Sequence, residues 1–192
     1  MKLTPLGIEG AWLAESPVLK DHRGYFREWF KLEDIKSATG RHFGIEQANV
    51  SVSSAGTLRG IHYSIAPRGQ AKWITCISGS IKDVIVDIRP DSKSFGQWIE
   101  VTLNGDSGKA VFIGEGLGHG FLVLEDNSAV AYLVSTPFSP KDEFEINPLD
   151  PRIGIAWGVD FGTIIISTKD LNGPTLDTLQ IMGKLPKMNT NE

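Results

Sequence analysis

Short runs of apolar and β-branched residues, separated by glycine and proline at close intervals, most constrain how this chain folds. The 192 residues include 21 glycines and 10 prolines. The runs 72–79 (KWITCISG) and 80–89 (SIKDVIVDIR) are rich in β-branched residues. Asp83 and Asp87 interrupt the apolar stretch of the second run, a pattern that favours a strand over a helix. The spacing therefore predicts many strands joined by turns.

Other segments show the same pattern. Strands are also predicted at residues 24–30, 45–54, 57–64, 109–116, 120–124 and 129–136. The sequence EDNS at 125–128 separates the last two and predicts a hairpin. Short helices are predicted only at 31–40, which ends at a glycine, and at 175–183. The fold class is therefore all-β, a sandwich or barrel with short peripheral helices.

The length and charge limit the function classes. A chain of 192 residues suits one domain, which we expect over 1–183, followed by a polar, frayed tail at 184–192. The formal net charge is −4, so no overall positive field attracts nucleic acid or an anionic membrane. The N-terminal segment lacks the features of a signal peptide, and no apolar run approaches the ~18 residues of a membrane span. We expect a cytoplasmic protein whose single cysteine, Cys76, is a core residue.

The stretch TLRGIHYS at 57–64 places Arg59 and His62 between apolar residues, and Lys72 follows soon after. Basic groups near the interior of a β-barrel are costly to desolvate unless an anionic partner is present. They are therefore either structural residues with internal partners or the wall of a pocket for an anionic ligand. Gln47 and Asn49 alternate with apolar neighbours, so both point to one face of their strand and favour the pocket.

Four other polar features each have an ordinary structural explanation. His119 lies among closely spaced glycines, which predicts either a hairpin turn with a solvent-facing histidine or a close approach of the backbone to something. Tyr132 fits a core tyrosine, and Asp170 a helix N-cap or turn residue. Arg23 and Glu28 fit an exposed ion pair of little energetic value.

A metal site is the competing hypothesis for this pocket. Metal sites in β-barrels combine two or three histidines with a carboxylate. His62 is followed by Tyr63 and Ser64, so no H-x-H pair is present, and His22 and His42 fall in predicted loops. We therefore predict that the protein binds no metal.

Several ordered motifs carry a family resemblance: DHRGYFRE, EQANVSVSSAGTLRGIHYS, GQAKWITCISGSIKDVIVDIR, SFGQWIEVTL, GEGLGHGF, AYLVSTPFSPKDE and NPLDPRIGIAW. From about residue 4 to about residue 175 the chain resembles the dTDP-4-dehydrorhamnose 3,5-epimerases. The resemblance implies a cupin-like jelly-roll fold, no metal and no cofactor. It also implies a homodimer and epimerisation at C3 and C5 of dTDP-4-keto-6-deoxy-D-glucose to give dTDP-4-keto-L-rhamnose.

The resemblance also implies roles for individual residues. His62 resembles the general base, Tyr132 the acid on the opposite face of the sugar, Asp170 the partner that orients the histidine, and Lys72 the group beside the sugar carbonyl. The positions that resemble substrate-binding ones are Arg23, Phe26, Glu28, Gln47, Asn49, Arg59, His119, Phe138, Glu143 and Lys169. Glu28 is expected to act across the dimer interface.

The chain departs from the family at Phe138, where the family often has a tyrosine that stacks on the thymine. Three alternative functions stay open. The first is a mono-epimerase acting only at C3 or only at C5 of a nucleotide-linked 4-ketosugar; the motif match disfavours a cupin-type isomerase that moves the keto group. The second is a sugar-binding jelly roll without catalysis. The third is a metal-dependent cupin oxygenase.

Overall fold

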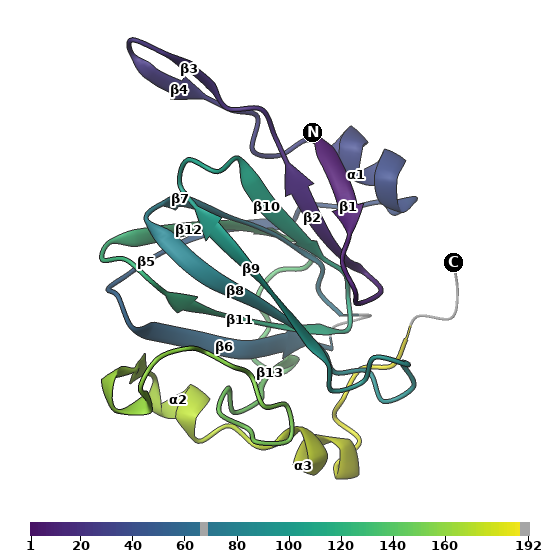
Figure 1. Ribbon diagram of the computed structural model, residues 1–192. Helices are drawn as coiled ribbons and strands as arrows, with labels where there is room; N and C mark the ends of the chain where they lie inside the picture. The colour runs from purple at the N-terminus through teal and green to yellow at the C-terminus, as the bar shows by residue number, and fades with distance from the viewer. Residues whose placement is uncertain (66–68, 189–192) are drawn as a thin grey trace.

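Two β-sheets packed face to face form the body of the protein in the computed structural model, which describes residues 1–65 and 69–188 (Figure 1). The first sheet has the order β1-β2-β10-β7-β12-β5, and the second β13-β6-β11-β8-β9. Neighbouring strands on these paths pair antiparallel, and β14 adds to β6 in parallel. The prediction of an all-β sandwich is confirmed.

The strands of the first sheet are β1 (Lys2–Pro5), β2 (Ala11–Glu15), β5 (Gln47–Ser53), β7 (Lys72–Ser78), β10 (Lys109–Ile113) and β12 (Ser128–Val134). Those of the second are β6 (Thr57–Ser64), β8 (Ser80–Asp87), β9 (Trp98–Asn104), β11 (Leu117–Val123), β13 (Glu143–Glu145) and β14 (Ile165–Ile166). The helices are α1 (Leu32–Thr39), α2 (Thr168–Leu171) and α3 (Leu176–Ile181), with a 3-10 turn at Phe161–Thr163.

Apolar side chains gather in three layers. The first lies between the sheets, where Ile74, Cys76 and Ile85 are fully buried, so Cys76 is the core residue that was predicted. The second covers the outer face of the second sheet with α3, through Leu176 and other residues. The third lies beneath α1 on the outer face of the first sheet. Burying each large apolar side chain contributes about 1.5–3 kcal/mol, so these layers hold the two sheets in fixed positions.

Both predicted helices are confirmed. α1 ends at Gly40, whose backbone φ of +72° is readily adopted by glycine, and whose N–H donates to the Lys36 carbonyl. α3 lies inside the predicted range 175–183, and the Thr175 hydroxyl caps its N-terminus. The strand predicted at 24–30 is too long, because the strand there, β4 (Gly24–Phe26), ends at Phe26.

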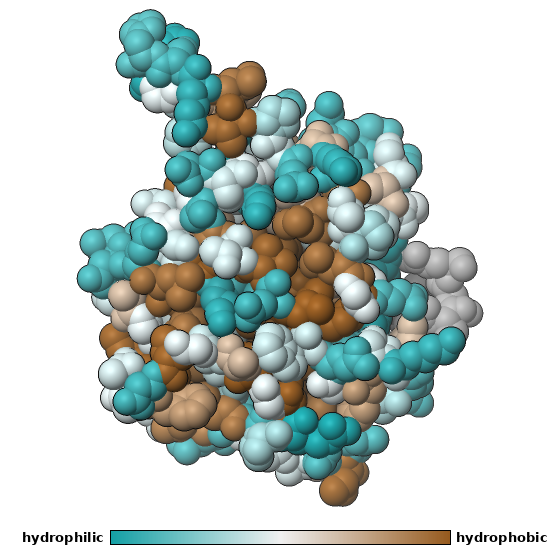
Figure 2. Space-filling model, viewed as in Figure 1, coloured by the Kyte–Doolittle hydropathy of each residue, from teal (hydrophilic) through white to brown (hydrophobic). Residues whose placement is uncertain are grey.

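The segment that contains this shortened strand forms an arm that stands away from the sandwich (Figure 1). It consists of β3 (Leu19–Asp21) and β4 (Gly24–Phe26), and Leu19 and Phe26 are 62% and 65% exposed. Apolar surface is visible on the arm in the space-filling view (Figure 2). An isolated two-stranded hairpin is marginally stable in water, so these exposed apolar residues are unusual for a free arm.

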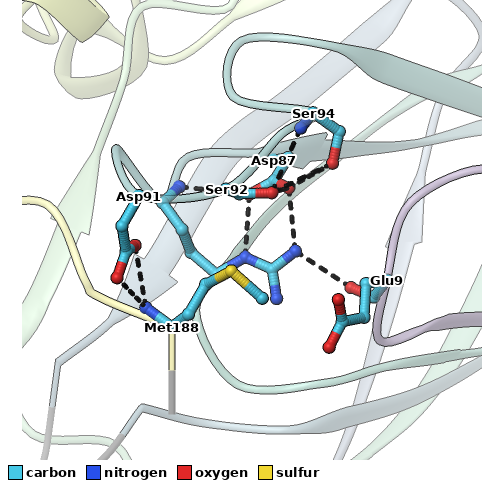
Figure 3. A network of polar contacts seen from close by, with 7 residues as sticks. Glu9, Asp87, Asp91, Ser92, Ser94 and Met188 are labelled. Carbon is cyan, nitrogen blue, oxygen red and sulfur yellow. Dashed lines mark hydrogen bonds and ion pairs between the residues drawn. The ribbon is translucent and has the colours of Figure 1, made fainter. Parts of the chain in front are cut away.

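The end of β8 carries a buried polar network (Figure 3). Asp87 is fully buried and accepts hydrogen bonds from the Arg89 backbone and guanidinium and from the hydroxyls of Ser92 and Ser94. Arg89 also donates to the Glu9 carbonyl, which ties this loop to the β1–β2 turn. Burial alone raises the pKa of Asp87, but the hydrogen bonds outweigh it and hold the pKa below its usual value.

Part of the predicted polar tail is anchored. The Lys184 carbonyl accepts a hydrogen bond from the Tyr63 hydroxyl, Leu185 packs against the second apolar layer, and the Met188 N–H donates to Asp91 (Figure 3). Residues 184–188 therefore continue the folded body. The remainder of the predicted tail, residues 189–192, lies outside the described residues.

Candidate active site

A bulge in β6 brings Arg59 and His62 to the same side of the sheet. Arg59 pairs with Phe121 of β11, and His62 pairs with His119. Three steps along β6 thus match two steps along β11, which is the pattern of a β-bulge with one extra residue. Residues three apart on a regular strand point to opposite faces, and the bulge removes that alternation.

Glycines on both strands make the bulge possible. Gly60 has a φ of +118°, and a Cβ atom there would lie 2.5 Å from the Gly120 Cα. A Cβ on Gly118 would lie 2.6 Å from the Ile61 side chain. The predicted close approach around His119 is therefore confirmed, and it is an approach to β6. The alternative of a solvent-facing hairpin turn is wrong, because His119 is buried within β11.

His62 is held by a carboxylate. Its Nε2 lies 2.8 Å from Oδ1 of Asp170, and the second oxygen of Asp170 accepts the Gly60 N–H at 3.3 Å. The prediction that Asp170 caps a helix is wrong, since Ser167 is the N-cap of α2 and accepts the Asp170 N–H. The side chain of His62 is 40% exposed and that of Asp170 only 6%. The ring nitrogen Nδ1 of His62 is therefore left for a ligand.

Asp170 stays ionised in this setting. Burial raises the pKa of Asp170. The hydrogen bond and the charge of His62, and the hydrogen bonds from Gly60 and Ser167, outweigh burial and lower the pKa below its usual value. A carboxylate on one ring nitrogen fixes the tautomer of a histidine and stabilises its protonated form. The pair is therefore built to accept a proton at Nδ1.

Two adjoining cavities open between the sheets beside this pair. The outer one has a volume of about 340 Å³ and is lined by Gln47, Asn49, His62, Gln70, Lys72, Tyr132, Val134, Phe138, Glu143, Phe144 and Lys169. The inner one has a volume of about 140 Å³ and is lined by Ser51, Arg59, His62, Lys72, His119, Phe121, Val130 and Tyr132. His62, Lys72 and Tyr132 line both and so form their common wall.

Lys72 is a buried cation at this wall. It is 7% exposed, its backbone pairs with β10 and β12, and its ammonium has no hydrogen-bond partner among the described residues. Burial lowers the pKa of Lys72, while the charges of Glu143 and Asp83 oppose that shift. A nearly buried ammonium that faces a cavity is suited to an oxygen atom of a ligand.

Tyr132 and Glu143 are both shifted toward their neutral forms. Burial raises the pKa of the Tyr132 phenol, and the charge of Arg59 opposes the shift. Burial also raises the pKa of the Glu143 carboxyl, and Lys72 is the main opposing charge. Tyr132 therefore keeps its proton over a wide pH range and is available as a proton donor.

The outer cavity holds a connected set of polar groups. Gln47 donates to Asn49 at 2.7 Å, which confirms that the two share a face, and accepts the Phe138 N–H at 2.9 Å. Phe138 is 62% exposed at the rim, and Lys169 pairs with Glu145 at 3.0 Å. This region presents amide groups, a cation and an exposed aromatic ring to a ligand.

Three predicted site residues lie elsewhere. Arg23, Phe26 and Glu28 belong to the arm or the segment that follows it, and none appears in the described lining of either cavity. The expected pair between Arg23 and Glu28 is wrong, because Arg23 contacts Asp21 at 2.6 Å. The structure of one chain thus leaves these three residues apart. It brings together the other eleven predicted residues, which are His62, Lys72, Tyr132, Asp170, Gln47, Asn49, Arg59, His119, Phe138, Glu143 and Lys169.

Sequence reasoning missed Asp83 and six residues that line the cavities: Ser51, Gln70, Phe121, Val130, Val134 and Phe144. Asp83 contacts His119, and its position inside an apolar strand was a usable signal. Among residues 1–65 and 69–188, no group of three or more His, Cys, Asp or Glu is placed to hold a metal ion. No helix in the same ranges is long and apolar enough to cross a membrane.

Known proteins of one family are similar to this chain over most of its length. The family model for dTDP-4-dehydrorhamnose 3,5-epimerase matches residues 5–178. A dTDP-4-dehydro-6-deoxyglucose 3-epimerase from Streptomyces bikiniensis is 45% identical over 182 residues, which cover 95% of this chain and 92% of that protein.

Solved structures agree closely in fold. An epimerase from Mycobacterium tuberculosis matches with a TM-score of 0.94 and 39% identity, over 98% of this chain and 94% of the other. A dTDP-6-deoxy-D-glucose-3,5-epimerase from Legionella pneumophila, solved with dTDP-4-keto-L-rhamnose, matches with a TM-score of 0.92 and 32% identity, over 98% and 99%. The predicted cupin-like fold is confirmed, and the chain belongs to the dTDP-4-dehydrorhamnose 3,5-epimerase family.

Proposed function

We propose that this protein converts dTDP-4-keto-6-deoxy-D-glucose to dTDP-4-keto-L-rhamnose by inverting C3 and C5. The observation that carries the proposal is the placement of a base and an acid on facing sheets. His62 projects from β6 of the second sheet with Asp170 behind it, and Tyr132 projects from β12 of the first sheet into the same cavities. Inversion needs a proton removed from one face of the sugar and another delivered to the opposite face.

The first step is proton removal by His62. Protons on C3 and C5 are α to the C4 ketone and are weakly acidic, because their removal gives an enolate. A histidine suits this step near neutral pH, and general-base catalysis of this kind contributes about 10²–10⁴-fold in rate. Asp170 holds Nε2, so Nδ1 takes the proton and the carboxylate stabilises the imidazolium that forms.

The enolate oxygen needs a fixed positive group. Lys72 lines both cavities beside His62 and is almost fully buried, so its charge acts in a site with little water. A preorganised group of this kind contributes about 10²–10³-fold in rate. Tyr132 then gives its proton to the opposite face of the carbon, the C4 ketone re-forms, and Tyr132 is left as a phenolate. His62 releases its proton to water and Tyr132 takes one up before the cycle repeats at the second carbon.

The rest of the substrate fits the two cavities and the rim of the outer one. Guanidinium groups bind phosphate oxygens in a bidentate manner, which suits Arg59 to the diphosphate. Exposed Phe138 at the rim offers a flat apolar face for the thymine ring, as an aromatic side chain can stack without a hydroxyl. Gln47, Asn49, Glu143 and Lys169 supply the remaining polar contacts.

A second chain completes the site in this proposal. Arg23, Phe26 and Glu28 lie outside the described cavities of their own chain, and the arm exposes Leu19, Tyr25 and Phe26. A homodimer in which each arm reaches the partner's cavity buries these apolar side chains and adds Arg23 to the diphosphate. Sedimentation or light scattering tests it, because a monomer at working concentration contradicts the shared site.

The activity is tested by incubation with dTDP-4-keto-6-deoxy-D-glucose in D₂O, followed by NMR of the product. Deuterium at both C3 and C5 in an inverted product supports the proposal. No deuterium at either carbon, with dTDP still bound, contradicts it and favours a sugar-binding protein without catalysis.

Epimerisation at C3 alone is the second candidate function. It is favoured by the 45% identity to a protein that is named a 3-epimerase. Deuterium at C3 with protium retained at C5 in the same experiment distinguishes it. The catalytic residues are the same in both cases, so the difference then lies in how the ring is held against His62 and Tyr132.

A further inference from the structure

A second histidine–carboxylate pair lies directly beside the first. His119 of β11 is the cross-strand partner of His62, and its Nε2 lies 2.7 Å from Oδ2 of Asp83 on β8. The side chains of His119 and Asp83 are 10% and 0% exposed. Both histidines therefore turn Nε2 to a buried carboxylate and line the inner cavity.

The bonding of Asp83 is incomplete. Its Oδ1 is buried and has no hydrogen-bond partner among the described residues. Burying a carboxylate costs several kcal/mol unless partners compensate, and proteins saturate such groups when they serve the fold alone. Asp83 has one close partner, His119, and the more distant charge of Lys72. This points to a role that depends on the state of His119.

We propose that Asp83 is a positioning residue that fixes the tautomer of His119, so that Nδ1 of His119 accepts a hydrogen bond from a hydroxyl of the sugar ring. The inference deepens the proposed function and rests on it. A carboxylate at Nε2 requires a proton on that nitrogen, so in a neutral ring Nδ1 carries the lone pair. Nδ1 has no hydrogen-bond partner in the described part of the chain.

The walls of the inner cavity offer mainly hydrogen-bond donors. Arg59 and Lys72 line this space of about 140 Å³, and their side chains can only donate. Nδ1 of His119 then supplies an acceptor among them. His119 thus selects a sugar ring with a hydroxyl on the side of β11. This contact determines which carbon of the sugar is presented to His62.

The test is Asp83→Asn, measured in three ways. The amide can donate its N–H₂ to Nε2, so ¹⁵N NMR is expected to show the proton of His119 move from Nε2 to Nδ1. The affinity for dTDP-glucose is expected to fall about 10–100-fold, the range typical of losing a group that orients a histidine, while the affinity for dTDP stays unchanged. The kcat/KM with the ketosugar is expected to fall by a similar factor.

A double-mutant cycle separates positioning from a structural effect. In a His119→Gln background, Asp83→Asn is expected to cause no further loss of dTDP-glucose affinity, because the two residues act as one unit. His119→Gln alone tests the hydroxyl contact if Asp83→Asn does not fold. Asp87→Asn on the same strand is the matched control, expected to lower stability and leave the His119 tautomer unchanged.

The inference is wrong if His119 keeps its Nε2 proton in Asp83→Asn, if dTDP affinity falls as much as dTDP-glucose affinity, or if the losses are additive. These binding readouts do not depend on turnover. A parent protein that fails to epimerise the ketosugar but shows the expected tautomer and sugar affinities would contradict the proposed function alone.

Discussion

Strand β8 places the same residue type in opposite settings: Asp83 in its middle, on the side of the cavities that we call the open end, and Asp87 at its last position, which we call the closed end. Asp83 and Asp87 lie on the same face of one strand, and both are buried. At the open end, Asp83 makes one hydrogen bond, and Asp170 nearby makes one to His62 and one to Gly60. At the closed end, Asp87 accepts bonds from Arg89, Ser92 and Ser94.

The difference separates a carboxylate that holds loops together from two that each hold a histidine beside a cavity. Asp87 has its partners within the protein, and the network links two loops (Figure 3). Asp83 and Asp170 each contact Nε2 of a histidine that lines the inner cavity. We therefore expect changes at the open end to affect the reaction more than stability, and changes at the closed end to do the reverse.

The largest expected effect is that of Asp170→Asn at the open end. The change preserves size but removes the charge and permits the wrong tautomer of His62. We expect kcat to fall about 10³–10⁴-fold, as for the loss of an orienting carboxylate in other enzymes. Steady-state kinetics measure the loss, and denaturant unfolding serves as the control for the fold. A variant with nearly parental kcat contradicts the role of Asp170.

Asp87→Ala tests the closed end. It leaves the Arg89 guanidinium, whose side chain is 6% exposed, buried without its carboxylate. Removing one member of a buried ion pair costs about 3–5 kcal/mol of unfolding free energy. Urea unfolding measures this cost. If the folded fraction of Asp87→Ala also loses most of its kcat/KM, the contrast between the two parts of β8 is contradicted.

A smaller loss is expected from Ser94→Ala. Its hydroxyl donates to Oδ2 of Asp87 at 2.6 Å, and Ser92 donates to the same oxygen. A hydrogen bond to a charged group contributes about 1.5–3 kcal/mol, and the lower value is expected here because Ser92 remains. The midpoint of urea unfolding reports the change, and an unchanged midpoint contradicts the account of the network.

The pH profile sharpens the description of the open end. Burial lowers the pKa of Lys72 and raises the pKa of Tyr132, so the loss of the Lys72 charge moves to lower pH and the loss of the Tyr132 proton moves to higher pH. The alkaline fall in kcat/KM is therefore expected to begin below the usual lysine pKa of about 10.4.

Lys72→Arg supplies the check on that assignment. A guanidinium stays charged above pH 12, so the alkaline limb is expected to move to higher pH while the acidic limb stays in place. An alkaline limb that does not move with this substitution would assign the ionisation to another group.

The sequence predicted most of the strands and many of the polar groups that line the cavities, but it did not predict how they meet. Arg59 and His62 are three residues apart and share a face only because of the bulge at Gly60. Strand periodicity cannot reveal a bulge, since the extra residue is defined by the partner strand. His119 was open to a turn interpretation for the same reason, because its glycines serve the approach to β6.

Other differences come from contacts distant in sequence. Asp83 and Asp87 both interrupted an apolar strand, and nothing in the pattern distinguished the partner of His119 from the centre of a structural network. The apolar residues of the arm were predicted as part of a longer strand, although Phe26 is exposed in one chain. Their positions depend on tertiary contacts, which local sequence does not encode.

The most direct test of the account is solvent exchange by His62→Ala. The variant and the parent are incubated with dTDP-4-keto-6-deoxy-D-glucose in D₂O, and deuterium at C3 and C5 is followed over time by NMR. We expect exchange at both carbons to slow by about 10²–10⁴-fold while dTDP binding is retained. Exchange at the parental rate would show that another group removes the proton and would contradict the assignment of the open end as the catalytic site.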